Sequence, residues 1–173
     1  MKLESIIRTI PDFPKQGIMF KDITTVLQNA EALQYCVHSF YEYYKDKQIS
    51  KVIGIESRGF IIGTALAYRL GVGFVPIRKP GKLPAEKIRQ EYQLEYGTDT
   101  IEMHKDAVRL GERVILHDDV LATGGTMQAA CSLVQQLGGN IVGLSFLIEL
   151  AFLQPRKKLS GFDILSLVQY DAE

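Results

Sequence analysis

The stretch Arg113-Val-Ile-Leu-His-Asp-Asp-Val-Leu-Ala-Thr-Gly-Gly-Thr126 carries the pattern that decides the fold. It opens with an apolar run, Val114 to Leu116, which predicts a buried strand. Two adjacent carboxylates, Asp118 and Asp119, follow, and then a turn of small, hydroxyl-bearing and glycine residues. After this turn, apolar residues recur at helical spacing until Gly138-Gly139, where the predicted helix ends; they are Met127, Ala130, Cys131, Val134 and Leu137.

This strand, turn and helix predict a binding site for an anion. A helix that opens on small residues exposes unpaired backbone N–H groups at the positive end of its dipole, and Thr123 and Thr126 add hydroxyls. A carboxylate accepts hydrogen bonds from two neighbouring hydroxyls at once, which suits a ribose diol. Because successive strand residues point opposite ways, Asp118 and Asp119 need not both contact the sugar. The stretch therefore indicates a ligand with a phosphate beside a diol.

Apolar runs and amphipathic segments alternate along the rest of the chain. Strands are expected at 52–55, 72–77, 141–150 and 162–168, and helices at 29–47, capped by Asn29, and 60–70, ended by Gly71. A short helix is expected over 4–10, ended by Pro11, and an irregular segment over 11–22. The alternation predicts a single α/β domain, residues 1–173, with a mostly parallel sheet and helices on both faces.

A second polar turn, Glu56-Ser-Arg-Gly59, links a predicted strand to a predicted helix. Its hydroxyl, guanidinium and glycine suit a second anion, although Arg58 could equally be an ordinary surface cation. The irregular segment before Asp22 exposes Phe20, which either anchors a loop to the core or offers a flat face to a planar ligand.

Residues 78–104 form a long polar region between predicted strands. Arg78, Lys79 and Lys82 stand in a stretch broken by prolines and a glycine, which indicates either a functional lid or a solvated basic loop. Loose alternation over 90–96, a turn at 97–98 and alternation over 100–104 predict a two-stranded hairpin or flap. Glu95 lies near its tip, where an exposed strand carboxylate is the simplest interpretation.

Composition bounds the class of protein. The 173 residues carry 20 basic and 20 acidic side chains, so a general nucleic-acid-binding surface is not indicated. Cys36 and Cys131 lie far apart, which points to neither a disulfide framework nor a zinc site. No apolar run approaches the length of a signal core or a membrane span, so we expect a cytoplasmic protein.

Several common active-site motifs are absent from the sequence. It contains no Gly-Lys-Ser/Thr phosphate loop, no dinucleotide fingerprint of three spaced glycines and no Gly-x-Ser-x-Gly elbow. The three histidines, His38, His104 and His117, lack metal-ligand spacing, so structural roles are expected for them.

The segment His117 to Thr126 resembles the phosphoribosyl diphosphate (PRPP) motif of the type I phosphoribosyltransferases. The wider pattern is similar to the branch of that family that acts on adenine. The matching pieces are Ile10-Pro-Asp-Phe-Pro14, Gly17-Ile-Met-Phe-Lys-Asp-Ile-Thr24, Glu56-Ser-Arg-Gly-Phe60, Ile77-Arg-Lys-Pro-Gly-Lys-Leu-Pro84 and Leu94-Glu-Tyr-Gly97. The resemblance implies the type I phosphoribosyltransferase fold, with an N-terminal hood mainly over 1–28 and a mobile lid and β-flap over about 78–104.

The resemblance also implies an activity, that of a pentosyltransferase. Such an enzyme transfers the phosphoribosyl group from PRPP to adenine and gives AMP and diphosphate, with Mg²⁺ held mainly through PRPP rather than by the protein directly. The family would also imply a homodimer in the cytoplasm, with no nucleic-acid or membrane partner.

Site residues follow from the resemblance position by position. Glu95 would be the acid/base residue at the purine, with Arg58 and Asp118 as its catalytic partners. Met19, Phe20 and Lys21 would hold adenine, and Glu56-Ser57 would be a cis peptide. PRPP and AMP would contact the two turns and the lid, at Ser57, Arg58, Arg78, Lys79, Lys82, Asp118, Asp119, Val120, Leu121, Ala122, Thr123, Gly124, Gly125 and Thr126.

Two alternatives stay open beside this interpretation. One is a sibling enzyme that uses guanine, xanthine or a pyrimidine, and the other is a PRPP-sensing regulator without catalysis. Lys21, where many members of the family carry arginine, keeps the charge but loses the planar fork. His117 stands where they commonly have an apolar residue.

Overall fold

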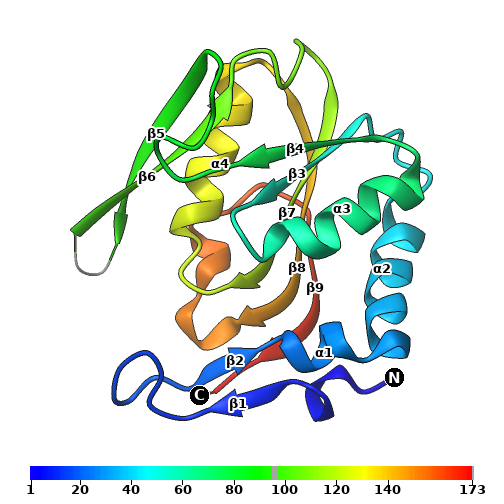
Figure 1. The fold of residues 1–173 in the computed structure, drawn as a ribbon, viewed down its shortest axis with the longest axis vertical. Coiled ribbons are helices and arrows are strands. Elements are labelled where there is room, and N and C mark those ends of the chain that lie inside the picture. The colour runs from blue at the N-terminus through cyan, green and yellow to red at the C-terminus, as the bar shows by residue number, and fades with distance from the viewer. Residues whose placement is uncertain (95–96, 173) are drawn as a thin grey trace.

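A five-stranded parallel sheet forms the centre of the molecule (Figure 1). The computed structural model describes residues 1–94 and 97–172. The sheet confirms the predicted parallel strands, and its order is β4 (Gly73–Ile77), β3 (Lys51–Ile55), β7 (Arg113–Leu121), β8 (Asn140–Leu150) and β9 (Ile164–Tyr170). Strand β7, the apolar run from which the fold was predicted, lies in the middle and pairs with β3 and β8.

Helices cover both faces of this sheet, as the alternation of elements predicts (Figure 1). Alternate residues of β7 serve the two faces. Val114 and Leu116 join the core under α4 (Gly125–Gln136), whereas Ile115 joins the core that faces α2 (Ala30–Tyr44) and α3 (Gly59–Leu70). This alternation is the geometry of a strand buried on both sides, and it explains why β7 is a continuous apolar run.

The predicted ends of the helices are set by the expected residues. The side chain of Asn29 accepts a hydrogen bond of 3.0 Å from the backbone N–H of Ala32 and caps α2. Gly71, with a φ of 70°, ends α3 in the left-handed conformation. Helix α2 ends at Tyr44, three residues before the predicted position, and the short helix α1 (Thr24–Gln28) precedes it.

The N-terminal segment differs from the prediction of a helix over residues 4–10. It forms a short 3₁₀ helix, η1 (Leu3–Ser5), and a strand, β1 (Arg8–Ile10), antiparallel to β2 (Phe20–Asp22), so the last residues of the expected irregular segment are also a strand. Two effects override the helical spacing. The residue before Pro11 disfavours helical dihedrals, and Arg8 forms an ion pair with Asp22, its partner across the strands.

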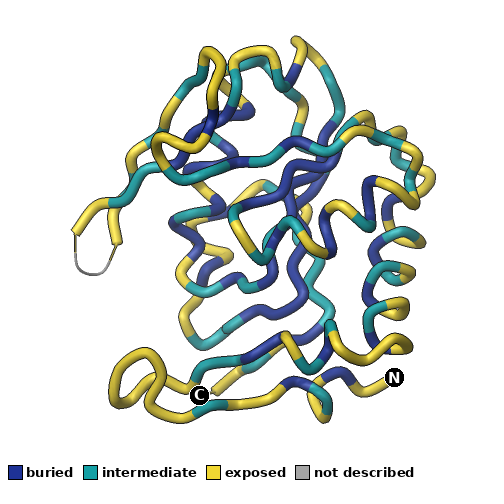
Figure 2. The backbone as a smooth tube through the Cα atoms, in the orientation of Figure 1, coloured by how far each residue is buried: buried dark blue, intermediate teal, exposed yellow. Residues whose placement is uncertain are grey.

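The predicted hairpin is present as β5 (Lys87–Leu94) and β6 (Gly97–His104), which pair antiparallel. Its turn was placed wrongly at 97–98, because Gly97 and Thr98 belong to β6 and pair with Leu94 and Gln93. Figure 2 shows the hairpin buried where Ile101 and Met103 join the α4 core and exposed toward its far end. Two further 3₁₀ helices, η2 (Ala151–Leu153) and η3 (Pro155–Lys157), link β8 to β9. Among the described residues, no helix has the length and hydrophobicity needed to span a membrane.

Candidate active site

The two polar turns predicted to bind anions meet at one edge of the sheet. Strands β3 and β7 are parallel neighbours, so the turn after β3 and the acidic end of β7 lie side by side. A cavity of about 350 Å³ opens between them. It is lined by most of the predicted site residues, namely Met19, Phe20, Lys21, Ser57, Arg58, Lys79, Asp118, Asp119, Val120, Ala122 and Thr126. Ile18, Ile55, Glu56, Tyr92 and Leu150, which the sequence did not single out, complete the lining.

A smaller hollow of about 80 Å³ adjoins this cavity and shares part of its wall. The loop between β7 and α4 forms it, with the predicted residues Leu121, Thr123, Gly124 and Gly125 among its lining. Gly124 has a φ of 82°, and a Cβ there would lie 3.1 Å from the carbonyl oxygen of Pro155, so the position requires glycine. The hollow opens at the N-terminus of α4, which suits a phosphate-sized anion.

Asp118 and Asp119 lie in the cavity wall, in surroundings that disfavour the charged forms of their carboxyl groups. The Oδ1 atom of Asp118 accepts a hydrogen bond of 2.9 Å from the backbone N–H of Asp119, and Oδ2 of the buried Asp119 lies 2.9 Å from Nε of Arg58 without forming a hydrogen bond. Burial and the neighbouring charge of Asp119 raise the pKa of Asp118 well above its usual value. Burial also raises the pKa of Asp119, although Arg58 opposes that shift. Both carboxylates therefore favour a ligand that supplies hydroxyl groups or positive charge.

The N-terminal segment forms one side of the cavity. The ring of Phe20 meets the ring of Phe13 edge-on at 5.1 Å, and Cζ of Arg58 lies 5.4 Å from its centroid. The ammonium group of Lys21 points elsewhere, because it donates to Oγ1 of Thr9 at 3.2 Å and lies 4.2 Å from the ring centroid of Tyr170. Phe20 thus borders both the cavity and Arg58.

The turn after β3 has the expected backbone. The peptide bond Glu56-Ser57 is cis, as predicted. A Cβ on Gly59 would lie 2.8 Å from the carbonyl oxygen of His117 and 3.0 Å from Oδ1 of Asp118, so the first turn of α3 packs directly on β7. This contact sets Arg58, the residue before α3, against the acidic pair.

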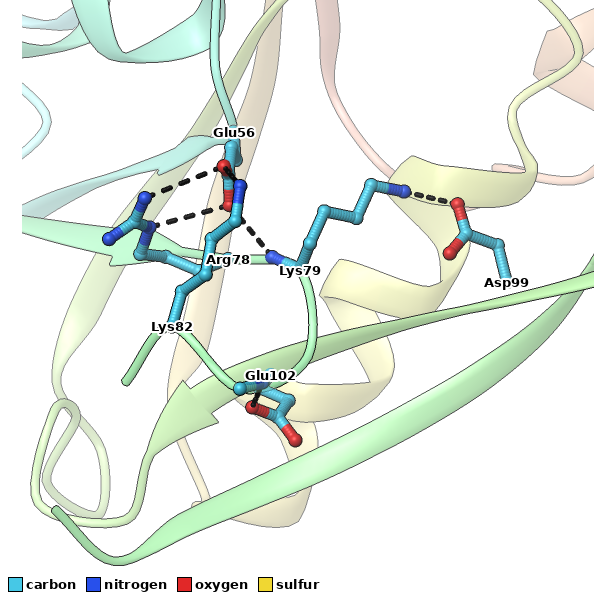
Figure 3. A network of polar contacts seen from close by, with 7 residues as sticks. Glu56, Arg78, Lys79, Lys82, Asp99 and Glu102 are labelled. Carbon is cyan, nitrogen blue, oxygen red and sulfur yellow. Dashed lines mark hydrogen bonds and ion pairs between the residues drawn. The ribbon is translucent and has the colours of Figure 1, made fainter. Parts of the chain in front are cut away.

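The three basic residues of the predicted lid are not equivalent (Figure 3). Lys79 lines the cavity, where its ammonium group forms an ion pair with Asp99 and lies 3.3 Å from the hydroxyl of Tyr92. Arg78 and Lys82 instead pair with Glu56 and are absent from the described lining of the cavity. The contacts of Glu56, Tyr92 and Asp99 were not predicted from the sequence. A correct register of the hairpin, which pairs Tyr92 with Asp99, could have indicated that these two residues lie together.

Glu95, predicted as the acid/base residue, lies outside the described residues, and its role stays a prediction. The three histidines have structural surroundings in the described part of the chain. His38 contacts Arg69 at 3.2 Å, His104 accepts from the backbone of Ala85 at 3.4 Å, and His117 is buried in β7. No group of three or more described acidic, histidine or cysteine side chains is placed to hold a metal by itself.

Comparison with known proteins shows the class of protein to which the chain belongs. Residues 22–160 match the family described as the phosphoribosyl transferase domain, so the chain contains a domain of this class. The adenine phosphoribosyltransferase of Alkaliphilus oremlandii is 56% identical over 171 residues, which cover 99% of both chains. The chain belongs to the adenine phosphoribosyltransferase family.

Solved structures agree with this assignment. The adenine phosphoribosyltransferase of Thermoanaerobacter pseudethanolicus is 54% identical and superposes with a TM-score of 0.95, covering 98% of both chains. The enzyme from Saccharomyces cerevisiae is 40% identical, with a TM-score of 0.91 over 96% of both chains. That structure is a complex with adenine and D-2,5-dideoxy-2,5-imino-altritol 1,6-bisphosphate.

Proposed function

We propose that this protein transfers the 5-phosphoribosyl group of PRPP to adenine and forms AMP and diphosphate. The observation that carries the proposal is the meeting of two anion-binding turns and an acidic pair at one edge of the sheet. PRPP has a diol flanked by a phosphate and a diphosphate, and this arrangement of groups matches both turns. The adenine in the Saccharomyces cerevisiae complex and the names of the relatives support the choice of base.

The sugar and its phosphate fit the β7–α4 side of the site. Asp118 and Asp119 would accept hydrogen bonds from the ribose hydroxyls, because both carboxylates line the cavity and Oδ2 of Asp119 is buried without a hydrogen-bond partner. The 5-phosphate would occupy the adjoining hollow, where small residues allow close approach to the backbone N–H groups at the start of α4. Val120, Leu121, Ala122, Thr123, Gly124, Gly125 and Thr126 would form its contacts.

The diphosphate would lie on the β3 side. Ser57 and Arg58 border the cavity there, and Lys79 reaches into it from the lid. Arg78 and Lys82 are close by and would add charge once the lid closes. The negative charge on diphosphate grows as its bond to ribose breaks, so these groups act mainly by positioning and electrostatics.

Adenine would lie under the hood formed by residues 1–28, with the face of Phe20 against its ring and Met19 and Lys21 nearby. Glu95, at the flap, would remove the ring proton from adenine as the base attacks the sugar. Closure of the lid and flap would exclude water and protect the sugar cation from hydrolysis.

Magnesium fits the donor chemistry of this site. Mg²⁺ prefers oxygen ligands and commonly combines one or two carboxylates with substrate phosphates. The cavity offers the carboxylates of Asp118 and Asp119, and no described cluster forms a complete metal cage. The ion would therefore be held mainly by PRPP, near these two residues, and would neutralise charge on the diphosphate when bound. A homodimer and a cytoplasmic location, both implied by the resemblance, are part of the same proposal.

Release of diphosphate tests the proposed function. The purified protein should release diphosphate only when PRPP, Mg²⁺ and adenine are all present. Glu95→Gln should lower turnover by about 10²–10⁴, the range of general acid–base catalysis, with an unchanged circular dichroism spectrum. Full turnover by Glu95→Gln would remove this residue from the mechanism. Diphosphate release that does not depend on adenine would reject the proposed reaction.

A further inference from the structure

Glu56 is the one acidic residue in the polar turn after β3, and its side chain is turned toward the lid rather than into solvent (Figure 3). Its backbone N–H donates to the carbonyl oxygen of Ile77 at 2.9 Å, which fixes it at the β3–β4 edge. The side chain is only 10% exposed and forms part of the cavity wall. A buried carboxylate beside a predicted diphosphate site needs an explanation, because it repels that ligand.

The contacts of Glu56 supply one. Its Oε2 atom accepts hydrogen bonds from the backbone N–H of Lys79 at 2.8 Å and from Nε of Arg78 at 3.3 Å. Its Oε1 atom forms an ion pair with Lys82 and lies 3.5 Å from Nη2 of Arg78. Burial alone would raise the pKa of Glu56, but Lys82, the Lys79 amide and Arg78 together lower it to about 2. The carboxylate is therefore ionised at neutral pH and holds two cations of the lid.

The positions of these groups relative to the cavity differ. Glu56 lines the cavity, whereas Arg78 and Lys82 are not among its described lining residues. The guanidinium of Arg78 is held at 3.3–3.5 Å, a loose geometry for a charged pair. Glu56 thus gives these two cations an anionic partner in the wall of the cavity.

We propose that Glu56 is a positioning residue that acts as an internal stand-in for diphosphate. It holds Arg78 and Lys82 at the rim of the site when the site is empty, and diphosphate takes these cations from it when the lid closes. Diphosphate succeeds because it carries more negative charge than one carboxylate, and Mg²⁺ offsets only part of it. The inference rests on the proposed function, since it assigns a second anion to the same cations.

Two roles of Glu56, a stand-in for diphosphate and a permanent support for the lid, predict opposite effects of its neutralisation on diphosphate binding. If Glu56 competes with diphosphate, its neutralisation frees Arg78 and Lys82 and strengthens diphosphate binding. If Glu56 must keep its contacts in the bound state, its neutralisation weakens binding. Glu56→Gln is suitable for this test because the amide keeps the size of the side chain and an acceptor for the Lys79 N–H.

Isothermal titration of magnesium diphosphate into the full-length protein measures the effect. Glu56→Gln should bind magnesium diphosphate about fivefold more tightly than the wild type, the factor that corresponds to an ion pair worth about 1 kcal/mol. Glu56→Asp keeps the charge on a side chain shorter by one methylene group. Its affinity for magnesium diphosphate should lie between those of Glu56→Gln and the wild type. In the steady state, the KM for PRPP should fall in Glu56→Gln while kcat does not rise, because diphosphate leaves more slowly.

Glu86→Gln is the matched control. Glu86 lies on the same loop, is exposed, and contacts only Lys105 among the described ion pairs, so its change alters the net charge equally without touching Arg78 or Lys82. It should bind magnesium diphosphate as the wild type does. If thermal melting shows that Glu56→Gln does not fold, the test is the comparison of Glu56→Asp with the wild type, in which Glu56→Asp should bind magnesium diphosphate more tightly.

Equal or weaker diphosphate binding by the folded Glu56 variants would overturn the inference and leave the proposed function intact. Equal tightening in Glu86→Gln would also overturn it, because net charge would then explain the effect. A wild-type protein that binds no magnesium diphosphate would instead reject the proposed function, and the inference with it.

Discussion

At the scale of one residue, the proposed ligand contact of Asp118 comes at the expense of the stability of the ligand-free protein. Its pKa is raised in the folded state by burial and by Asp119, so its contribution to stability is largest at low pH and is lost as the pH rises above the usual carboxyl range. At neutral pH, where this carboxyl is ionised in the unfolded chain, its place in the folded protein therefore lowers stability when no ligand is bound.

Asp118→Asn should raise the melting temperature of the ligand-free protein at neutral pH while it weakens PRPP binding. The amide keeps the acceptor for the Asp119 N–H and removes the buried charge. Each kcal/mol gained corresponds to a rise of about 2–4 °C for a chain of this size. Thermal melting with and without PRPP measures both effects, and the gain should shrink as the pH approaches 4. A lower melting temperature without ligand would contradict the electrostatic account of this pair.

His117 is a second residue whose state can be assigned. The hydroxyl of Ser145 lies 3.2 Å from the carbonyl oxygen of Leu116 and 3.0 Å from Nδ1 of His117. Nε2 is buried without a partner. Burial lowers the pKa of His117 from 6.5 to about 3, so the ring is neutral in the folded protein.

A neutral buried histidine makes stability depend on pH in a defined direction. The unfolded chain binds a proton below pH 6.5 that the folded protein does not bind until about pH 3, so stability is lost as the pH falls through this window. His117→Leu removes the effect, and the variant should gain about 2 kcal/mol over the wild type between about pH 7 and 5. Urea denaturation of both proteins at several pH values measures the gap; parallel curves would show that His117 does not titrate in this way.

The sequence predicts which residues share the cavity better than it predicts the contacts between them. Asp118 lies near the end of a buried strand, and Ser57 and Thr126 follow buried strands. The ends of parallel strands meet at one edge, so their common cavity was predictable. The pairing of Arg78 and Lys82 with Glu56 was not, because it depends on how the lid folds back across the end of β3. Tyr92 reaches the cavity only through the register of the hairpin.

At the scale of elements, the contact between α3 and β7 positions the two halves of the site. Gly59 allows it, because a Cβ there would lie 2.8 Å from the backbone oxygen of His117 and 3.2 Å from Cα of Asp118. Backbone atoms in a central strand cannot move aside easily, so a larger residue would displace the start of α3 and Arg58 with it.

Gly59→Ala should therefore cost about 1–3 kcal/mol of stability, the range of overpacked sites, and should weaken PRPP binding. Gly63→Ala, one turn further along α3, is the control: its Cβ would meet only side chains, Phe74 at 3.1 Å and His117 at 3.4 Å. This control should keep PRPP affinity. Denaturation and titration of both variants distinguish them, and equal losses of affinity would mean that the contact of Gly59 with β7 does not position Arg58.

The elements themselves follow from the sequence where one pattern dominates. Continuous apolar runs correctly predicted the buried strands β3, β7 and β8, and Asn29 and Gly71 correctly predicted ends of α2 and α3. The prediction failed over residues 4–10, where Ile6, Ile7 and Ile10 have helical spacing. There a strand pairing with distant residues, Phe20 to Asp22, determines the structure, and spacing within one segment cannot reveal it.

At the scale of the whole molecule, the hood, the parallel sheet and the hairpin enclose one cavity from three sides. Residues from β2, from the turn after β3, from β5 and from β7 line it together. This convergence is what makes a transfer between two bound substrates possible, because the base and the sugar can be held in contact while water is excluded.

The identity of the base is the central claim, and a steady-state comparison of purine bases tests it most directly. With PRPP and Mg²⁺ held saturating, kcat/KM should be highest for adenine by a wide margin over guanine and xanthine, with AMP as the product. A higher kcat/KM for guanine or xanthine than for adenine would contradict the account.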